Sequence, residues 1–123
     1  MTDNEGHTGR PPLAVTVQDT DHPGQVLSLT GDLDHAQTGP LEQALTEALN
    51  ANQPLRLLVI DLTGVGFCDS SGLNTFLKAR HETEEHSIEL RLVHAGPRVR
   101  RLLQITGTAE LFSLYDDLVQ ALT

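Results

Sequence analysis

Gly66-Phe67-Cys68-Asp69-Ser70-Ser71-Gly72-Leu73 directly follows residues 55–62, the most apolar run of the chain. An apolar run of this length predicts a buried strand, and the acid, hydroxyls and glycine behind it predict a turn into a helix. Ser70 would then stand at the N-terminal end of that helix, where backbone N–H groups lack partners and the helix dipole favours negative charge. A serine in such a position can cap the helix or accept a phosphate.

Length and composition predict a single folded domain. The chain has 123 residues, of which 38% are hydrophobic and 20% charged, as in ordinary globular proteins. Since there are three Phe, one Tyr and no Trp, we expect a core of Leu, Val and Ile. Residues 1–12 are polar and end in Pro11-Pro12, so we expect a disordered tail followed by a domain over residues 13–123.

The net charge of −9 restricts the partners that the chain can bind. Eight Lys and Arg stand against 17 Asp and Glu, which argues against nucleic acid and against insertion into or binding to an anionic membrane. A single cysteine, Cys68, cannot form an internal disulfide and fits a reducing compartment. Since no segment resembles a signal peptide or a transmembrane helix, we expect a cytoplasmic protein with a protein or small-molecule partner.

Hydrophobic periodicity predicts the element order β-β-α-β-α-β-α-β-α. The predicted strands are residues 13–18, 26–29, 55–62, 88–92 and 111–115. The predicted helices begin between residues 36 and 40, at the Asp69-Ser70 turn, at 97 and at 118. The predicted inner face is Leu41, Ala44, Leu45, Ala48 and Leu49 in the first helix, and Val99, Leu102, Leu103 and Thr106 in the third. The first two strands form a hairpin, and the central strand, apolar on both faces, should be covered on both. Helices between the later strands predict an α/β fold with a mixed, mostly parallel sheet of about five strands and about four helices.

Searches for catalytic and ligand-binding motifs give negative results. The Gly-x-Ser-x-Gly turn of serine hydrolases is absent around Ser70, because Cys68 occupies the first glycine position. His81 and His86 are five residues apart, which places them on different faces of a helix. Asp69 stands where a dinucleotide-binding loop would carry its third glycine. We therefore expect no catalytic residue, no metal site and no cofactor.

Spacing alone leaves the role of the acids and hydroxyls open. Either Asp69 or Ser70 could cap the helix by accepting a hydrogen bond from a backbone N–H group. Asp32 and Asp34, which close the second predicted strand, fit ordinary turn or capping roles.

Three segments carry a family resemblance. They are Gly31-Asp32-Leu33-Asp34-His35, then Phe67-Cys68-Asp69-Ser70-Ser71-Gly72-Leu73, and Pro97-Arg98-Val99-Arg100-Arg101-Leu102-Leu103 with Thr106-Gly107 behind it. With these segments, residues 13–122 resemble a STAS domain, and specifically the bacterial anti-sigma factor antagonists. Asn74 and Lys78 depart from the small residues that family members often carry there.

The resemblance implies a switch that itself performs no catalysis. An antagonist of this family binds an anti-sigma factor, which is also a serine kinase, and so releases a sigma factor. Phosphorylation, here of Ser70, ends the interaction, and a protein phosphatase restores it. The implied partner-binding residues are Asp32, Asp34, Asp69, Ser70, Ser71 and Gly72. The alternative is that the domain serves as a docking subunit of a membrane lipid-transport ATPase complex.

Overall fold

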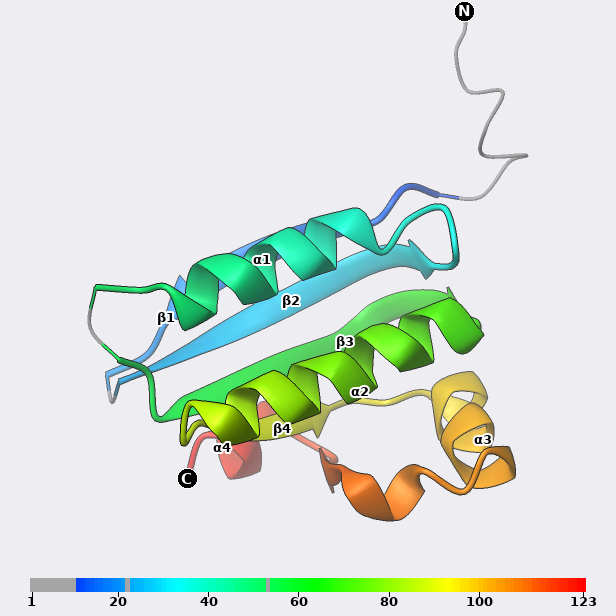
Figure 1. The fold of residues 1–123 in the computed structure, drawn as a ribbon. Coiled ribbons are helices and arrows are strands. Elements are labelled where there is room, and N and C mark those ends of the chain that lie inside the picture. Colours follow the sequence, from blue (N-terminus) through cyan, green and yellow to red (C-terminus); the bar gives the residue numbers. More distant parts are fainter. Residues whose placement is uncertain (1–10, 22, 53) are drawn as a thin grey trace, which may run out of the picture.

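The computed structural model describes residues 11–21, 23–52 and 54–123, and its strands form one mixed sheet in the order β1-β2-β3-β4-β5 (Figure 1). The strands are β1 (Ala14–Asp19), β2 (Gly24–Leu33), β3 (Leu57–Cys68), β4 (Glu89–Val93) and β5 (Ser113–Tyr115). The helices are α1 (Gly39–Leu49), α2 (Ser70–Glu85), α3 (Pro97–Ile105) and α4 (Leu118–Ala121), with a short 3-10 helix, η2 (Ala109–Leu111). Only β1 runs antiparallel to its neighbour, which confirms the predicted element order and the mixed, mostly parallel sheet.

Strands β2 and β3 are longer than the sequence predicts. They pair in parallel from Gly24 beside Leu57 to Leu33 beside Cys68, with register shifts along the way. The residues just before Asp34 and Asp69 were expected in turns, but they continue the two strands because each strand supplies partners for the backbone groups of the other. The turn between β3 and α2 therefore shrinks to Asp69.

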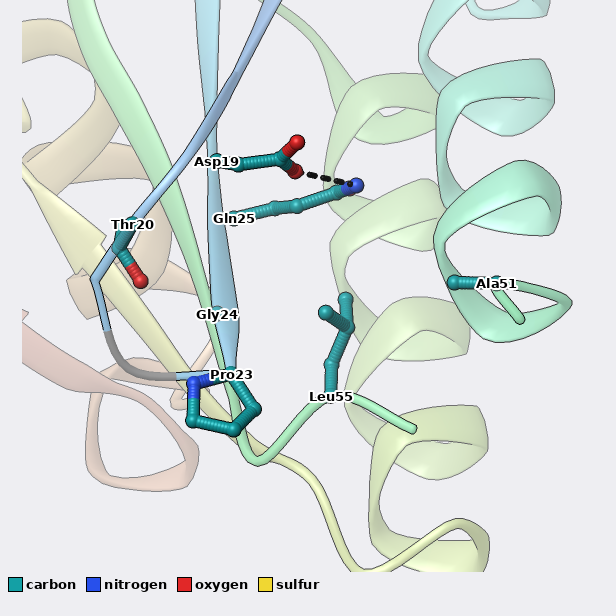
Figure 2. A pocket seen from close by; sticks show the side chains of 7 residues that line it. All are labelled: Asp19, Thr20, Pro23, Gly24, Gln25, Ala51 and Leu55. Carbon is teal, nitrogen blue, oxygen red and sulfur yellow. Dashed lines mark hydrogen bonds between the residues drawn. The ribbon is translucent and has the colours of Figure 1, made fainter. Parts of the chain in front are cut away.

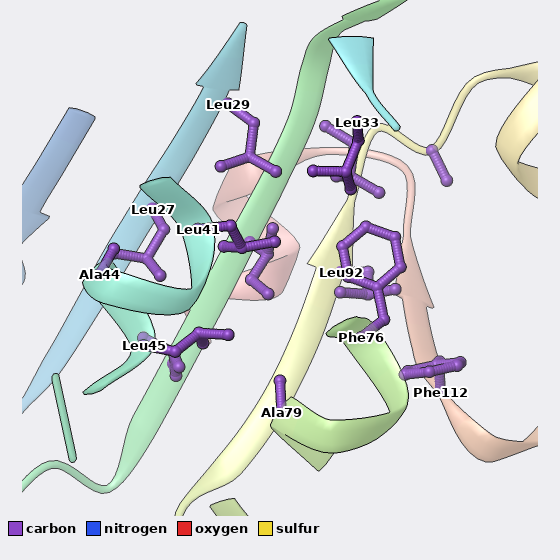
Figure 3. Packing of buried hydrophobic residues seen from close by; sticks show 14 of the residues in the cluster. Leu27, Leu29, Leu33, Leu41, Ala44, Leu45, Phe76, Ala79, Leu92 and Phe112 are labelled. Atoms are coloured by element: carbon purple, nitrogen blue, oxygen red, sulfur yellow. The ribbon is translucent and has the colours of Figure 1, made fainter. Parts of the chain in front are cut away.

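Helices α1 and α2 cover one face of the sheet and enclose the larger core (Figure 1). Figure 3 shows Leu27 and Leu29 of β2 beside Leu41 and Leu45 of α1, with Phe76 of α2 over the neighbouring part of the sheet. The predicted inner face of α1 is buried, apart from the partly exposed Leu49. The core is aliphatic, as composition predicted, around one edge-to-face pair of Phe76 and Phe112.

The opposite face of the sheet is only partly covered. Short helix α4 packs there through Ala121 against Val26, Val59 and Val93. Further along β3, Asp61 is half-buried and Thr63 is exposed. The prediction that the central strand is covered on both faces therefore holds around Val59 and fails towards its carboxyl end.

Two predictions near the C-terminus were wrong in detail. Thr106, expected on the inner face of the third helix, is the exposed C-cap of α3, and its hydroxyl donates to the Leu102 carbonyl at 2.7 Å. Gly107 ends that helix in a left-handed conformation with φ of 74°. Leu111, expected to open the last strand, lies in η2, so β5 starts at Ser113.

Residues 1–10 of the predicted tail lie outside the described residues, but its last two residues are ordered against the sheet. The Pro11 carbonyl accepts a hydrogen bond from the Asp32 N–H at 3.3 Å. Pro12 passes so close to Gly31, which has a φ of 103°, that a side chain there would collide with the Pro12 carbonyl. Within the described ranges, no helix is both long and apolar enough to span a membrane.

Candidate functional site

The carboxyl ends of β2 and β3 bring together two of the segments that carried the resemblance. Asp32 and Leu33 pair with Phe67 and Cys68, and the Asp69 N–H donates to the Leu33 carbonyl at 3.2 Å. Both strands point towards the start of α2, at the right in Figure 1. Residues 31–34 and 66–73 therefore form one surface region, which we call the β2–β3 edge.

Asp69, and not Ser70, caps helix α2. Its backbone is extended, and its Oδ1 accepts hydrogen bonds from the N–H groups of Ser71 at 2.8 Å and Gly72 at 3.3 Å. Ser70 is the first helical residue and is exposed. Its hydroxyl has no hydrogen-bond partner within the described ranges. The structure thus resolves the alternative that spacing left open, and it leaves the Ser70 hydroxyl accessible.

Ser71 and Gly72 hold α2 close to the sheet. Ser71 is half-buried, and its carbonyl accepts a hydrogen bond from the Thr75 hydroxyl at 3.1 Å. Gly72 is buried, and a Cβ there would lie 2.7 Å from Cys68 Sγ and 2.9 Å from the Leu33 side chain. The absence of a side chain at Gly72 therefore lets the first turn of α2 approach both strands.

Cys68 is a packing residue in this site. Burial, together with the nearby Asp69 charge, raises the pKa of the Cys68 thiol to about 12. The thiol stays protonated at neutral pH, so it lacks the thiolate that nucleophilic chemistry requires.

Asp32 and Asp34 lie at the β2–β3 edge, as the resemblance implied, but they are buried instead of exposed. Only 7% of Asp32 and 6% of Asp34 is exposed. The Asp32 N–H donates to the carbonyl of Pro11, in the chain that enters β1. Asp34 stabilises the turn after β2: it accepts hydrogen bonds from the Ala36 N–H at 3.0 Å and from Gln37 Nε2 at 3.3 Å. Asp32 has no side-chain hydrogen bond or ion pair within the described ranges.

Two features of this end of the sheet were missed in the sequence. Gly66 is exposed, and a Cβ added to it would meet only Asp32 Oδ1, at 3.5 Å. Asp61 accepts hydrogen bonds from the Thr63 N–H at 3.0 Å and the Thr63 hydroxyl at 2.6 Å, and its Oδ1 lies 3.2 Å from His94 Nδ1. The one available signal for this cluster was an acid standing alone in the most apolar run of the chain.

Burial pushes the pKa of Asp61 upward. The hydrogen bonds from Thr63 and the neighbouring His94 together outweigh burial, so the pKa lies below its usual value.

Other parts of the surface offer less chemistry. Figure 2 shows a pocket of about 310 Å³ at the amino end of β2 and β3, the end of the sheet opposite to Ser70. Asp19 is the one ionisable residue among those that line it, and it accepts a hydrogen bond from Gln25 Nε2 at 3.1 Å. Among the described residues, no group of three His, Cys, Asp or Glu side chains is placed to hold a metal ion.

In a comparison with known protein families, residues 14–121 match the family described as STAS domain. The chain belongs to the STAS domain family. An anti-sigma F factor antagonist of Paenibacillus polymyxa is 31% identical over 98 residues, which span 80% of this chain and 83% of that protein. An anti-sigma-B factor antagonist of Listeria monocytogenes is 30% identical over 102 residues, which span 83% of this chain and 86% of the relative.

A solved structure supports the fold of this STAS domain. The crystal structure of an anti-sigma factor antagonist from Mycobacterium paratuberculosis superposes with a TM-score of 0.79 at 31% identity. The match covers 89% of this chain and 91% of that one.

Proposed function

We propose that this STAS domain is an anti-sigma factor antagonist. In this role it binds an anti-sigma factor that is also a serine kinase, and it is released when that kinase phosphorylates Ser70. The observation that carries the proposal is the exposed Ser70 hydroxyl at the first position of α2, free of internal hydrogen bonds in the described ranges. The chain performs no catalysis itself, and a protein phosphatase would restore the active form in the cytoplasm.

The relatives favour this function over the alternative of a docking subunit in a lipid-transport ATPase complex. Both bacterial relatives are named antagonists of anti-sigma factors, and each match spans at least 80% of this chain. The matches also cover 83% and 86% of the two relatives' own lengths.

Local geometry supports a switch based on charge. Phosphorylation would add roughly −1.5 to −2 charges at pH 7 to the first turn of a 16-residue helix. The helix dipole and its free N–H groups tolerate negative charge there, so the domain need not refold. A partner carboxylate about 4 Å from the phosphate would be repelled by roughly 4 kcal/mol per charge pair at an effective dielectric of about 20. That repulsion weakens binding by about several hundredfold, which is enough to release a partner.

Phosphorylation by the anti-sigma factor of the source organism tests the proposal. The wild-type chain, incubated with that kinase and ATP, should gain one phosphate, and peptide mass spectrometry should locate it on Ser70. Ser71→Ala is the matched control, because it changes the neighbouring hydroxyl and leaves Ser70 in place. A phosphate that appears equally on Ser70→Ala would contradict the assignment.

Binding of the same anti-sigma factor provides a second readout. Ser70→Ala should keep the affinity of the unmodified chain, whereas Ser70→Asp should weaken it by about tenfold or more, because a carboxylate carries part of the charge of a phosphate. Equal affinities for Ser70→Asp and Ser70→Ala would argue against a charge-based switch.

A further inference from the structure

A pocket opens on the partly covered face of the sheet, beside α4 and at the amino ends of β3 and β4. Its volume is about 380 Å³, and small-molecule sites typically occupy about 300–1,000 Å³. Leu57 of β3 and Leu122, which follows α4, form its apolar lining. Arg56 and Arg91 line it as well. The pocket therefore combines apolar surface with two cationic groups.

The guanidinium group of Arg91 is fixed by its neighbours and still has unused donors. Its Nε donates to Glu89 Oε2 at 2.8 Å, and its Nη1 donates to the Ala121 carbonyl at 2.8 Å. The group also lies over the Tyr115 ring, 5.2 Å from the ring centroid. Only 15% of the side chain is exposed, yet Nη2 has no acceptor within the described ranges. Since an arginine carries its N–H donors in a rigid plane, Arg91 offers the pocket a donor group that is already oriented.

Arg56 supplies a second cation without an internal partner. Its N–H donates to the Pro23 carbonyl at 2.6 Å, and its carbonyl accepts from the Glu89 N–H at 2.9 Å, so its backbone is fixed. Its side chain is exposed and makes no hydrogen bond or ion pair with the described residues. The chain has a net charge of −9 and only eight Lys and Arg, so two of them at one pocket mark a local departure from its acidic surface.

Two acids at the same pocket affect the charge there. Glu89 is already paired with Arg91. Asp21 lines the pocket too, but it is exposed and has no ion pair among the described residues. Water screens an exposed charge strongly, whereas a guanidinium group that hydrogen-bonds an anion directly acts at short range. The arginines should therefore outweigh Asp21 for a ligand that contacts them.

We propose that this pocket binds a small organic anion, with its carboxylate or phosphate group on Arg56 and Arg91 and its apolar part against the two leucines. Carboxylate and phosphate oxygens match the geometry of guanidinium donors. The inference is independent of the antagonist role, because the pocket lies at the amino end of β3 and Ser70 follows its carboxyl end. It gives the domain a small-molecule site remote from the β2–β3 edge.

Nuclear magnetic resonance titration of the full chain with three probes tests the inference. Hexyl phosphate and hexanoate carry the two kinds of anionic group on the same apolar chain, and inorganic phosphate lacks that chain. We expect hexyl phosphate or hexanoate to shift the backbone amide signals of Leu57, Glu89 and Leu122, and the tighter binder of the two identifies the anionic group. Inorganic phosphate should bind at least about tenfold more weakly, since it has no apolar part to bury.

Three variants test the role of charge with the tighter probe. Arg56→Gln should weaken binding about tenfold, because a hydrogen bond from a charged donor is lost. Asp21→Asn should strengthen binding about two- to threefold, because it removes an exposed charge that repels the anion. Arg98→Gln is the matched control and should bind like the wild type, because Arg98 is an exposed arginine of α3 without a side-chain partner in the described part of the chain.

The absence of shifts at the three pocket amides with both organic probes at millimolar concentration would overturn the inference. Wild-type affinity in Arg56→Gln would do so as well. Equal weakening by Arg56→Gln and Arg98→Gln would show a general effect of net charge instead of a site. Equal affinities for inorganic phosphate and hexyl phosphate would show a simple counterion site, which also contradicts the proposal.

Discussion

Asp69 and Ser70 divide between them two tasks that either residue could have performed. The carboxylate of Asp69 accepts two backbone N–H groups of the first turn of α2, so the helix start is capped without the serine. The hydroxyl of Ser70 can therefore be modified without loss of the cap. This division explains how a surface serine can change its charge while the helix beneath it stays in place.

Because Asp69 caps the helix and Ser70 does not, we expect substitutions of the two residues to differ in their effect on the free energy of unfolding. Asp69→Ala should lower the free energy of unfolding by about 1 kcal/mol, because two N–H groups lose their acceptor. Ser70→Ala should change it by less than about 0.5 kcal/mol, since an exposed hydroxyl without an internal bond is lost. Urea unfolding followed by circular dichroism measures both. An equal loss in the two variants would show that Ser70 shares in the cap.

At the scale of secondary-structure elements, the carboxyl ends of the strands position the site. Parallel pairing of β2 with β3 sets Leu33 beside Cys68, and the segments around Asp32 and Ser70 meet for that reason. On β3, the Asp61 cluster is built similarly: Thr63 lies two residues along the same strand, and His94 follows β4, the next strand of the sheet.

The hydrogen bond from Thr63 to Asp61 should affect how the free energy of unfolding depends on pH. The pKa of Asp61 is lowered in the fold, so its ionised form contributes stability above its unfolded pKa of about 3.9, and this stability is lost as pH falls through the folded pKa. Thr63→Val removes the hydroxyl that donates at 2.6 Å. The variant should have a higher Asp61 pKa, and its loss of stability between pH 6 and pH 3 should be smaller than in the wild type.

Carbon-detected NMR titration of the Asp61 carboxyl group, with urea unfolding at several pH values, measures both effects. Thr16→Val is the matched control, because Thr16 is exposed on β1 and has no side-chain hydrogen bond in the described part of the chain. An Asp61 pKa unchanged by Thr63→Val would show that the backbone N–H of residue 63 and His94 lower it without the hydroxyl.

At the scale of the whole molecule, one core connects the site to the rest of the domain. The larger cluster extends from Leu13 through the strands and α1 to Phe76 of α2 and Phe112 (Figure 3). Leu33 and Cys68 at the β2–β3 edge belong to this cluster. We therefore expect the site to unfold together with the domain and not as a separate unit.

Phe76 tests this cooperativity. Phe76 is fully buried and contacts Phe112 edge to face at 6.4 Å between ring centroids. Phe76→Ala should lower the free energy of unfolding by about 3–5 kcal/mol in a single transition. Val119→Ala, at a residue that is 74% exposed, should change it by less than about 0.5 kcal/mol. A two-step curve, in which fluorescence of a dye attached near α2 changes first, would show that the site unfolds independently.

The element order and the helix start at Ser70 follow from the sequence, because they depend on local periodicity and on residue types that turn and cap the chain. Alternating apolar residues predicted the strands, Leu41 and its neighbours predicted α1, and Asp69-Ser70 marked the start of α2 within one residue. The STAS resemblance added which serine to consider. These features depend on contacts between residues that are close to one another in the chain, and such contacts can be predicted without knowing the fold.

Other features were decided by the tertiary structure alone. The strands β2 and β3 extend through residues expected in turns, because each completes the hydrogen bonds of the other. Asp32 and Asp34 are buried at the ends of these strands, and Asp32 Oδ1 is the one atom that a Cβ on exposed Gly66 would meet. The sequence determined which residue types stand at the β2–β3 edge. Only the pairing of distant segments decided which of them are exposed and which are buried, because exposure depends on what lies above a residue in space.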